Sequence, residues 1–297
     1  MFAAPTFPNP WRFEANPEVY LLVAFLVGAY IYMVRVIGPR AVQPGESVIT
    51  RRHLWCFSIA MVMLFVASTW PVHQIGEGYL YSVHMLQHMM LSYFLPPLVL
   101  LATPQWLLRV LIGQGRAYRV VRFMTRPVVA GVVFNMVVIA THVPSVVNTS
   151  TVNGPLHYAV HLAVVMAALL MWMPVVGPFD ELHMTYGGKM IYLFLQSVVP
   201  TIPAGWLTFA EGAVYKHYNQ PVRVWGISVT SDQQLAGAIM KLGGGVFLWT
   251  IVIYLFFKRF SAEPANANSY RRDEAPLTYQ SVAEAFERTP APVEQDQ

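Results

Sequence analysis

The sequence predicts an all-α integral membrane protein that crosses the bilayer seven times. Hydrophobic residues make up 56% of the 297 positions and charged residues only 11%, which is too few for the polar surface of a soluble domain. Apolar runs of about 20 residues recur along the chain, and that length is what a helix needs to cross the hydrocarbon core. Pro, Gly and charged residues separate the runs, which place the seven helices near 18–37, 53–72, 79–102, 127–147, 155–177, 189–210 and 232–258.

The two ends of the chain differ from the membrane domain between them, which we place at 18–260. Residues 1–17 lack a basic stretch followed directly by a short apolar core, so we expect the first helix to stay in the mature protein. Residues 261–297 are polar and rich in Pro, Glu and Gln. This composition predicts a disordered tail after the last helix.

Basic residues are distributed unevenly between the predicted loops. Arginines are concentrated in 38–52 and 103–126, Lys258 and Arg259 begin the tail, and 73–78 and 148–154 contain no Lys or Arg. Because basic loops tend to stay on the cytoplasmic side, we expect an outer N-terminus and a cytoplasmic C-terminus. The net charge of +4 then reflects membrane topology, and no nucleic-acid partner is predicted.

Histidine and methionine are concentrated at the outer ends of two predicted helices. The stretch "YSVHMLQHMM" (81–90) contains two histidines four residues apart, and "HYAVH" (157–161) repeats that spacing. Residues four apart lie on the same face of a helix. Imidazole suits copper, zinc, iron and nickel, whereas thioether sulfur favours Cu(I). We therefore predict a Cu(I) site with the ligands His84, His88, His157, His161, Met85 and Met89.

A packing role is the alternative for each of these side chains alone, since histidine or methionine on a membrane helix can bond a neighbour or fill a gap. The cluster as a whole favours function, because polar groups in hydrocarbon are costly and mark functional sites. The inner Met166, Met171 and Met173 are expected to be packing residues. His53 and His183, on the inner side, are expected in a loop or a helix cap.

Further polar residues lie at the same outer level. Asp232 and Gln233 open the seventh helix, where they can accept the ring N–H of a ligand histidine; Asp232 can alternatively cap its own helix, with Ser231 as a competing cap. We add His142 and His73 as accessory residues, and Met240, deeper on nearly the same face as Asp232, as a carrier for a soft ion. Two residues stand apart: Lys241 near mid-membrane, which must snorkel, pair with lipid or another subunit, or face a polar interior, and the lone Cys56, expected to be buried.

Four stretches of the chain resemble a known family. They are "HMLQHMMLSYFLPPLVLLATP" (84–104), "THVPSVVN" (141–148), "PLHYAVHLAVVMAALLMW" (155–172) and "SDQQLAGAIMK" (231–241). The resemblance is to the CtaG-type membrane proteins that are required for assembly of caa(3)-type cytochrome c oxidase, and it covers essentially 18–260. The polar residues shared with that family fall on His84, His88, His142, His157, His161, Asp232 and Gln233. Thr141, Ala236 and Lys241 depart from the family's usual Trp, Gly and Trp.

This resemblance implies a role in maturing the copper centre of a respiratory-chain oxidase in the bacterial plasma (inner) membrane. The implied partners are oxidase subunits, with membrane lipid and an outer-side copper donor protein. We expect no enzymatic activity and no catalytic residues. The working hypothesis is that Cu(I) arrives from the outside, is held by two to four of the paired histidines with Met85 or Met89 assisting, and passes to an oxidase subunit.

Three other functions remain open at this point. A b-type haem protein would also use histidines from separate helices, although pairs four residues apart better suit a compact ion. A metal-dependent membrane enzyme fits the same ligands, but has no evident general base besides Asp232 and the histidines. A scaffold that holds an assembly intermediate needs no metal at all.

Overall fold

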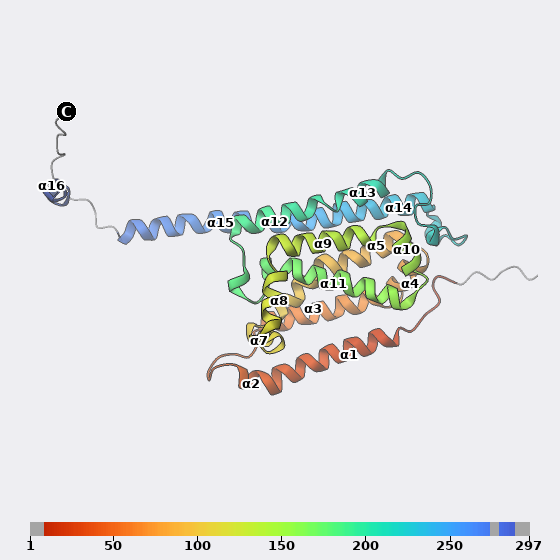
Figure 1. The fold of residues 1–297 in the computed structure, drawn as a ribbon, viewed down its shortest axis with the longest axis horizontal. Coiled ribbons are helices and arrows are strands. Elements are labelled where there is room, and N and C mark those ends of the chain that lie inside the picture. Colours follow the sequence, from red (N-terminus) through yellow and green to blue (C-terminus); the bar gives the residue numbers. More distant parts are fainter. Residues whose placement is uncertain (1–8, 274–278, 289–297) are drawn as a thin grey trace, which may run out of the picture. The chain divides into compact units, whose positions relative to one another are not determined.

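A computed structural model describes residues 9–273 and 279–288, and all regular structure in these two ranges is helical. The chain divides into two compact units, Met1–Ile253 and Tyr254–Gln297. The first unit is a helical bundle in which α1 (Pro17–Tyr32) packs on α3 (Arg51–Ser68), and α9 (Pro127–Thr141) packs on α11 (Gly154–Val176) (Figure 1).

Within residues 9–273 and 279–288, five helices are long and apolar enough to cross a membrane, or up to seven spans are present if each of two bent helix pairs is one span. The pairs are α3 with α4 (Val72–Gly78), bent by 42°, and α8 (Arg116–Met124) with α9, bent by 73°. The seven spans predicted from the sequence are thus the upper end of the range of five to seven. The five continuous spans are Pro17–Ala41, Tyr81–Ala102, Gly154–Val176, Tyr186–Thr208 and Val229–Ser261.

Most spans contain more than one helical segment. The segments not yet given are η1 (Met33–Ile37), α2 (Gly38–Ala41), α5 (Tyr81–Met89), η2 (Met90–Phe94), α6 (Leu95–Ala102), α7 (Gln105–Ile112), α10 (Pro144–Ser150), η3 (Asp180–Leu182), α12 (Tyr186–Val198), α13 (Thr201–Thr208), η4 (Lys216–Tyr218), η5 (Val224–Gly226), α14 (Val229–Ala238), η6 (Ile239–Gly243), α15 (Gly244–Asp273) and α16 (Tyr279–Arg288). Parts of the predicted disordered tail, 261–273 and 279–288, are therefore helical, and its other residues lie outside the described ranges.

Proline explains where two predicted helix ends were wrong. The predicted fourth helix continued to 147, but α9 ends at Thr141 and α10 restarts at Pro144, because proline has no N–H and keeps the residue before it extended. The predicted second helix likewise stops early, before Pro71, and the chain restarts as α4. The stretch 73–78, which we predicted to be a loop, is therefore helical.

The outside of the bundle is apolar, and its interior contains a group of buried polar side chains in addition to a hydrophobic core. Leu21, Val128 and Phe209 are 72%, 78% and 84% exposed. Gln87 and Asp232 are each only 1% exposed. Exposed apolar helices with a buried polar centre are the arrangement that a bilayer requires.

Two π-helical turns, η2 and η6, interrupt the helices that surround this polar centre. Turn η2 precedes Pro96 and Pro97, which cannot donate backbone hydrogen bonds. The carbonyl of Ser92, four residues before Pro96, instead accepts a hydrogen bond of 3.3 Å from Trp172 Nε1. Single π turns inside α-helices are frequent at functional sites.

Several residues singled out in the sequence lie away from this centre. Lys241 Nζ donates to Thr201 Oγ1, which gives this lysine a partner within the chain. His53 completes the N-terminal cap of α3, as expected for a cap residue. Met171 and Met173 are buried as predicted, whereas Met166 is exposed and Cys56 only partly buried.

Candidate metal centre

Glu77 on α4 lies at the centre of a histidine cluster at the end of the bundle where α5 begins. Its Oε1 atom is 2.9 Å from His84 Nδ1, 3.3 Å from His157 Nε2 and 3.7 Å from His161 Nε2. These histidines come from α5 and α11, and the Glu77 side chain is only 18% exposed. One carboxylate therefore joins the two helices that carry the paired histidines.

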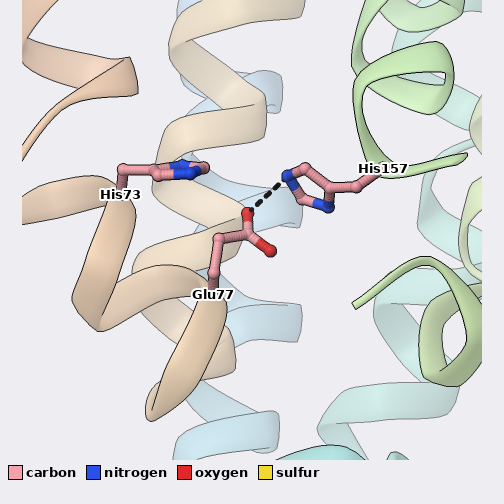
Figure 2. Close-up of side chains that lie close together, drawn as sticks. All are labelled: His73, Glu77 and His157. Atoms are coloured by element: carbon pink, nitrogen blue, oxygen red, sulfur yellow. Dashed lines mark ion pairs between the residues drawn. The ribbon is translucent and has the colours of Figure 1, made fainter. Parts of the chain in front are cut away.

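His73 completes this group from the same helix as Glu77. The two residues are four apart and share a face of α4. The metal-binding atoms of His73, Glu77 and His157 all lie within 4.8 Å of one another, and Figure 2 shows the carboxylate directed between the two rings. His73 Nδ1 and the side-chain amide nitrogen of Gln87 lie 3.2 Å apart, a contact that orients the ring.

His88 forms the inner edge of the cluster. Its ring centroid is 4.4 Å from that of His84 and 4.8 Å from that of His161. The His157 and His161 rings are 4.3 Å apart. The four histidines predicted as ligands therefore meet at one place in the structure.

Two polar atoms of this cluster, Glu77 Oε2 and His88 Nε2, are buried without a hydrogen-bond or ion-pair partner among the described residues, and His157 Nε2 and His161 Nε2 have only the Glu77 Oε1 ion pairs at 3.3 and 3.7 Å. An unsatisfied buried polar atom costs about 1–3 kcal/mol. His84 donates through Nδ1 to Glu77, so its Nε2 keeps a free lone pair in the neutral ring. The cluster thus offers imidazole nitrogens and a carboxylate oxygen, a donor set that fits zinc, copper or iron.

Sequence reasoning missed Glu77, because 73–78 was interpreted as an outer loop. A usable signal was present: His73 and Glu77 have the same four-residue spacing as the two histidine pairs. The local packing depends on Gly76, where an added Cβ would lie 3.1 Å from the backbone nitrogen of His84. This close approach of α4 to α5 brings Glu77 within reach of His84.

The predicted methionine ligands lie on a different side of α5. Each follows a histidine by one residue and is therefore about 100° further around the helix. Met85 Sδ is 3.4 Å from Nε2 of His142, at the end of α9. Met89 faces Gly244, where an added Cβ would lie 3.2 Å from Met89 Cε. Glu77 is the side chain that lies within 3.7 Å of three of the predicted histidines, His84, His157 and His161.

Asp232 does not accept a ring N–H as predicted but caps the helix that carries His84 and His88. Its Oδ2 accepts a 2.7 Å hydrogen bond from the Tyr81 backbone N–H, and its Oδ1 accepts from the Ser82 N–H at 2.9 Å and from the Ser82 hydroxyl. The first N–H groups of a helix need such acceptors and favour negative charge. Asp232 therefore fixes the start of α5.

The loop between α13 and α14 covers the cluster. Gln233 Oε1 accepts from the Val214 N–H at 2.8 Å, so it holds this loop and not a histidine ring as predicted. Tyr215 Oη donates to the His142 carbonyl at 2.9 Å, and Tyr218 Oη donates to the Gly76 carbonyl at 3.0 Å. Burial raises the pKa of Tyr215 to about 12 and also raises the pKa of Tyr218, so both hydroxyls remain donors at neutral pH.

These features define an all-helical membrane protein with a buried histidine–carboxylate centre. Residues 20–262 match the family described as cytochrome c oxidase caa3 assembly factor (Caa3_CtaG), and the chain belongs to this family. The resemblance seen in four sequence stretches is thereby confirmed. Comparison with curated proteins and with solved structures gave no match.

Proposed function

We propose that this assembly factor receives a copper ion in the outer half of the membrane and delivers it to cytochrome c oxidase. The observation that carries the proposal is the position of Glu77 Oε1, within 3.7 Å of nitrogen atoms from three histidines. Copper is the cargo, and the ligands we assign to it are His73, Glu77, His84, His157 and His161. An outer-side donor protein would supply the ion.

Electrostatics support a cation at this position. A carboxylate inside a bilayer is costly unless it is paired, and all the ion pairs found for Glu77 are with histidines. The cluster also offers more donors than a four-coordinate ion uses. Surplus donors allow ligands to exchange one at a time, which a transfer protein needs and a closed structural site does not.

A metal-free scaffold is the second candidate, and one observation favours it. His84 Nδ1 and Glu77 Oε1 already form a hydrogen bond of 2.9 Å, so part of the cluster is satisfied without an ion. A b-type haem is disfavoured, because the contacting rings of His84, His88 and His161 would have to separate to admit a porphyrin. Metal content of the purified protein separates these candidates.

The proposed direction of delivery depends on topology, which the charge asymmetry predicts. Reporters fused at 74–78, 150–153 and about 215 are expected to lie outside, and reporters at about 115 and in the tail inside. Fusions active on only one side of the bacterial plasma membrane measure this directly. A tail reporter on the outside would invert the bundle and place the cluster on the cytoplasmic half.

Deleting the protein is expected to leave the oxidase with its haem largely present but with little copper and low activity. Metal analysis and haem spectra of the purified oxidase test this, with the re-expressed wild type as control. Normal copper in the oxidase would contradict delivery. Partial rescue by added copper would favour delivery over a scaffold, because a missing scaffold cannot be replaced by free ions.

A further inference from the structure

A second group of metal-seeking side chains surrounds a cavity on the other side of α5. The cavity has a volume of about 30 Å³, enough for a single ion or water. Residues from α5, η2, α9, α11 and η6 line it. Its nitrogen and sulfur donors come from Met85, His88, Met89, His142 and Met240.

The hydrogen bonds of His142 define which of its nitrogens is free. His142 Nδ1 lies 2.6 Å from the Val138 carbonyl, which can only accept, so Nδ1 carries the proton. In the neutral ring Nε2 then holds a lone pair, and this atom is 3.4 Å from Met85 Sδ. Two lone-pair donors face each other there with no hydrogen between them, as they would around a shared cation. Backbone bonding of the opposite ring nitrogen is also typical of metal-binding histidines.

The other donors extend the same set. His88 lines the cavity, and its Nε2 has no hydrogen-bond partner among the described residues. Met89 and Met240 are 4% and 6% exposed. Met89 ends α5 directly before the π turn η2, and Met240 lies in the π turn η6, so both interrupted helices supply sulfur to the cavity.

The chemistry of this set differs from that of the outer cluster. Its lining among the described residues includes imidazole and thioether groups but no carboxylate. Thioether sulfur selects soft ions, and carboxylate suits harder ones. A divalent ion would find no compensating negative charge in this apolar cavity, which makes it costly, whereas a monovalent ion carries half that charge.

We infer that this cavity is a separate site for a soft monovalent cation, Cu(I) or its analogue Ag(I), bound by His142, Met85 and Met240 with Met89 and His88. The inference rests on the proposed function in one respect: the same Cu(I) ion would reach this site from the outer cluster. His88 connects the two, because it lines the cavity and its ring contacts both His84 and His161. The ion keeps its oxidation state throughout.

The test uses the full-length protein in detergent, titrated separately with Ag(I) and with Zn(II). Replacing Met85 and Met240 by leucine removes two sulfurs at nearly constant volume, a change that cores tolerate well. We expect the affinity for Ag(I) to fall by at least about 10-fold and Zn(II) binding at the outer cluster to stay within about 2-fold of wild type. Met166→Leu, at an exposed position, is the matched control and should change neither.

Silver K-edge X-ray absorption of the wild type gives a readout that needs no variant, and we expect sulfur neighbours around Ag(I). Unchanged Ag(I) affinity in the double variant, or only nitrogen and oxygen neighbours in the wild type, overturns the inner site. Glu77→Gln separates the two proposals, because it should abolish Zn(II) binding and leave sulfur-bound Ag(I) in place. If wild type binds Ag(I) through sulfur but never Zn(II) or copper through Glu77, the outer site fails while the inner site stands.

Discussion

Glu77→Gln is expected to lower the affinity of the purified protein for copper by more than about 100-fold, beyond the 10–100-fold typical of losing an outer-shell partner of a metal ligand. The substitution removes a charge and one donor oxygen but keeps the size of the side chain. It also keeps a carbonyl oxygen that can accept from His84 Nδ1, now 2.9 Å from Glu77 Oε1. The bundle should therefore still fold, so a lower copper affinity would show that Glu77 itself binds the ion. Metal titration in detergent, with thermal unfolding measured in parallel, tests this.

The matched control is Glu46→Gln, the same change at an exposed turn residue, which should bind copper as wild type does. The double variant Glu77→Gln/His161→Ala should lose less copper-binding free energy than the two single variants lose together, because both changes dismantle one site. His183→Ala, whose ring bonds the Gly177 carbonyl, should leave copper binding unchanged. Normal copper binding by Glu77→Gln, together with a fully active oxidase, would favour the scaffold.

The histidines of the centre could be predicted because their signal is local. Four-residue spacing places His84 with His88, and His157 with His161, on single helix faces, and a helix buried in a membrane turns such a polar face inward. The same local rule separates Met85 and Met89 from these histidines by about 100°, so the division into two donor sets was also available from the sequence. Hydropathy and charge likewise indicated an all-helical membrane protein.

Glu77 and Asp232 could not be placed in this way, because their roles depend on contacts between distant segments. Glu77 enters the cluster only because α4 restarts after Pro71 and approaches α5 at Gly76. Asp232 caps a helix that begins 151 residues earlier in the chain. A helix N-terminus without its own capping side chain, as at Leu80, indicates that an acceptor is needed but not which segment supplies it.

Asp232→Ala is expected to lower the free energy of unfolding by about 3–5 kcal/mol, the range found when one partner of a buried charged interaction is removed. The reason is that the Tyr81 N–H, the Ser82 N–H and the Ser82 hydroxyl would all lose their acceptor inside the bundle. The start of α5 would then fray, and copper affinity should fall because His84 and His88 lose their fixed positions. Thermal or denaturant unfolding in detergent, followed by copper titration of the folded fraction, measures both effects.

Two further variants show whether the capping contacts are the cause. Ser82→Ala keeps both backbone hydrogen bonds to Asp232 and should lower the free energy of unfolding by only about 1 kcal/mol. Asp180→Ala removes a carboxylate whose side chain is 93% exposed, and it should leave the free energy of unfolding unchanged. If Asp232→Ala unfolded like wild type but lost copper, its carboxylate would act on the ion or on a histidine directly. If Asp232→Ala instead lost both folding stability and copper affinity, and Ser82→Ala lay between wild type and Asp232→Ala in both quantities, Asp232 would act on the centre by holding the first turn of α5 in place.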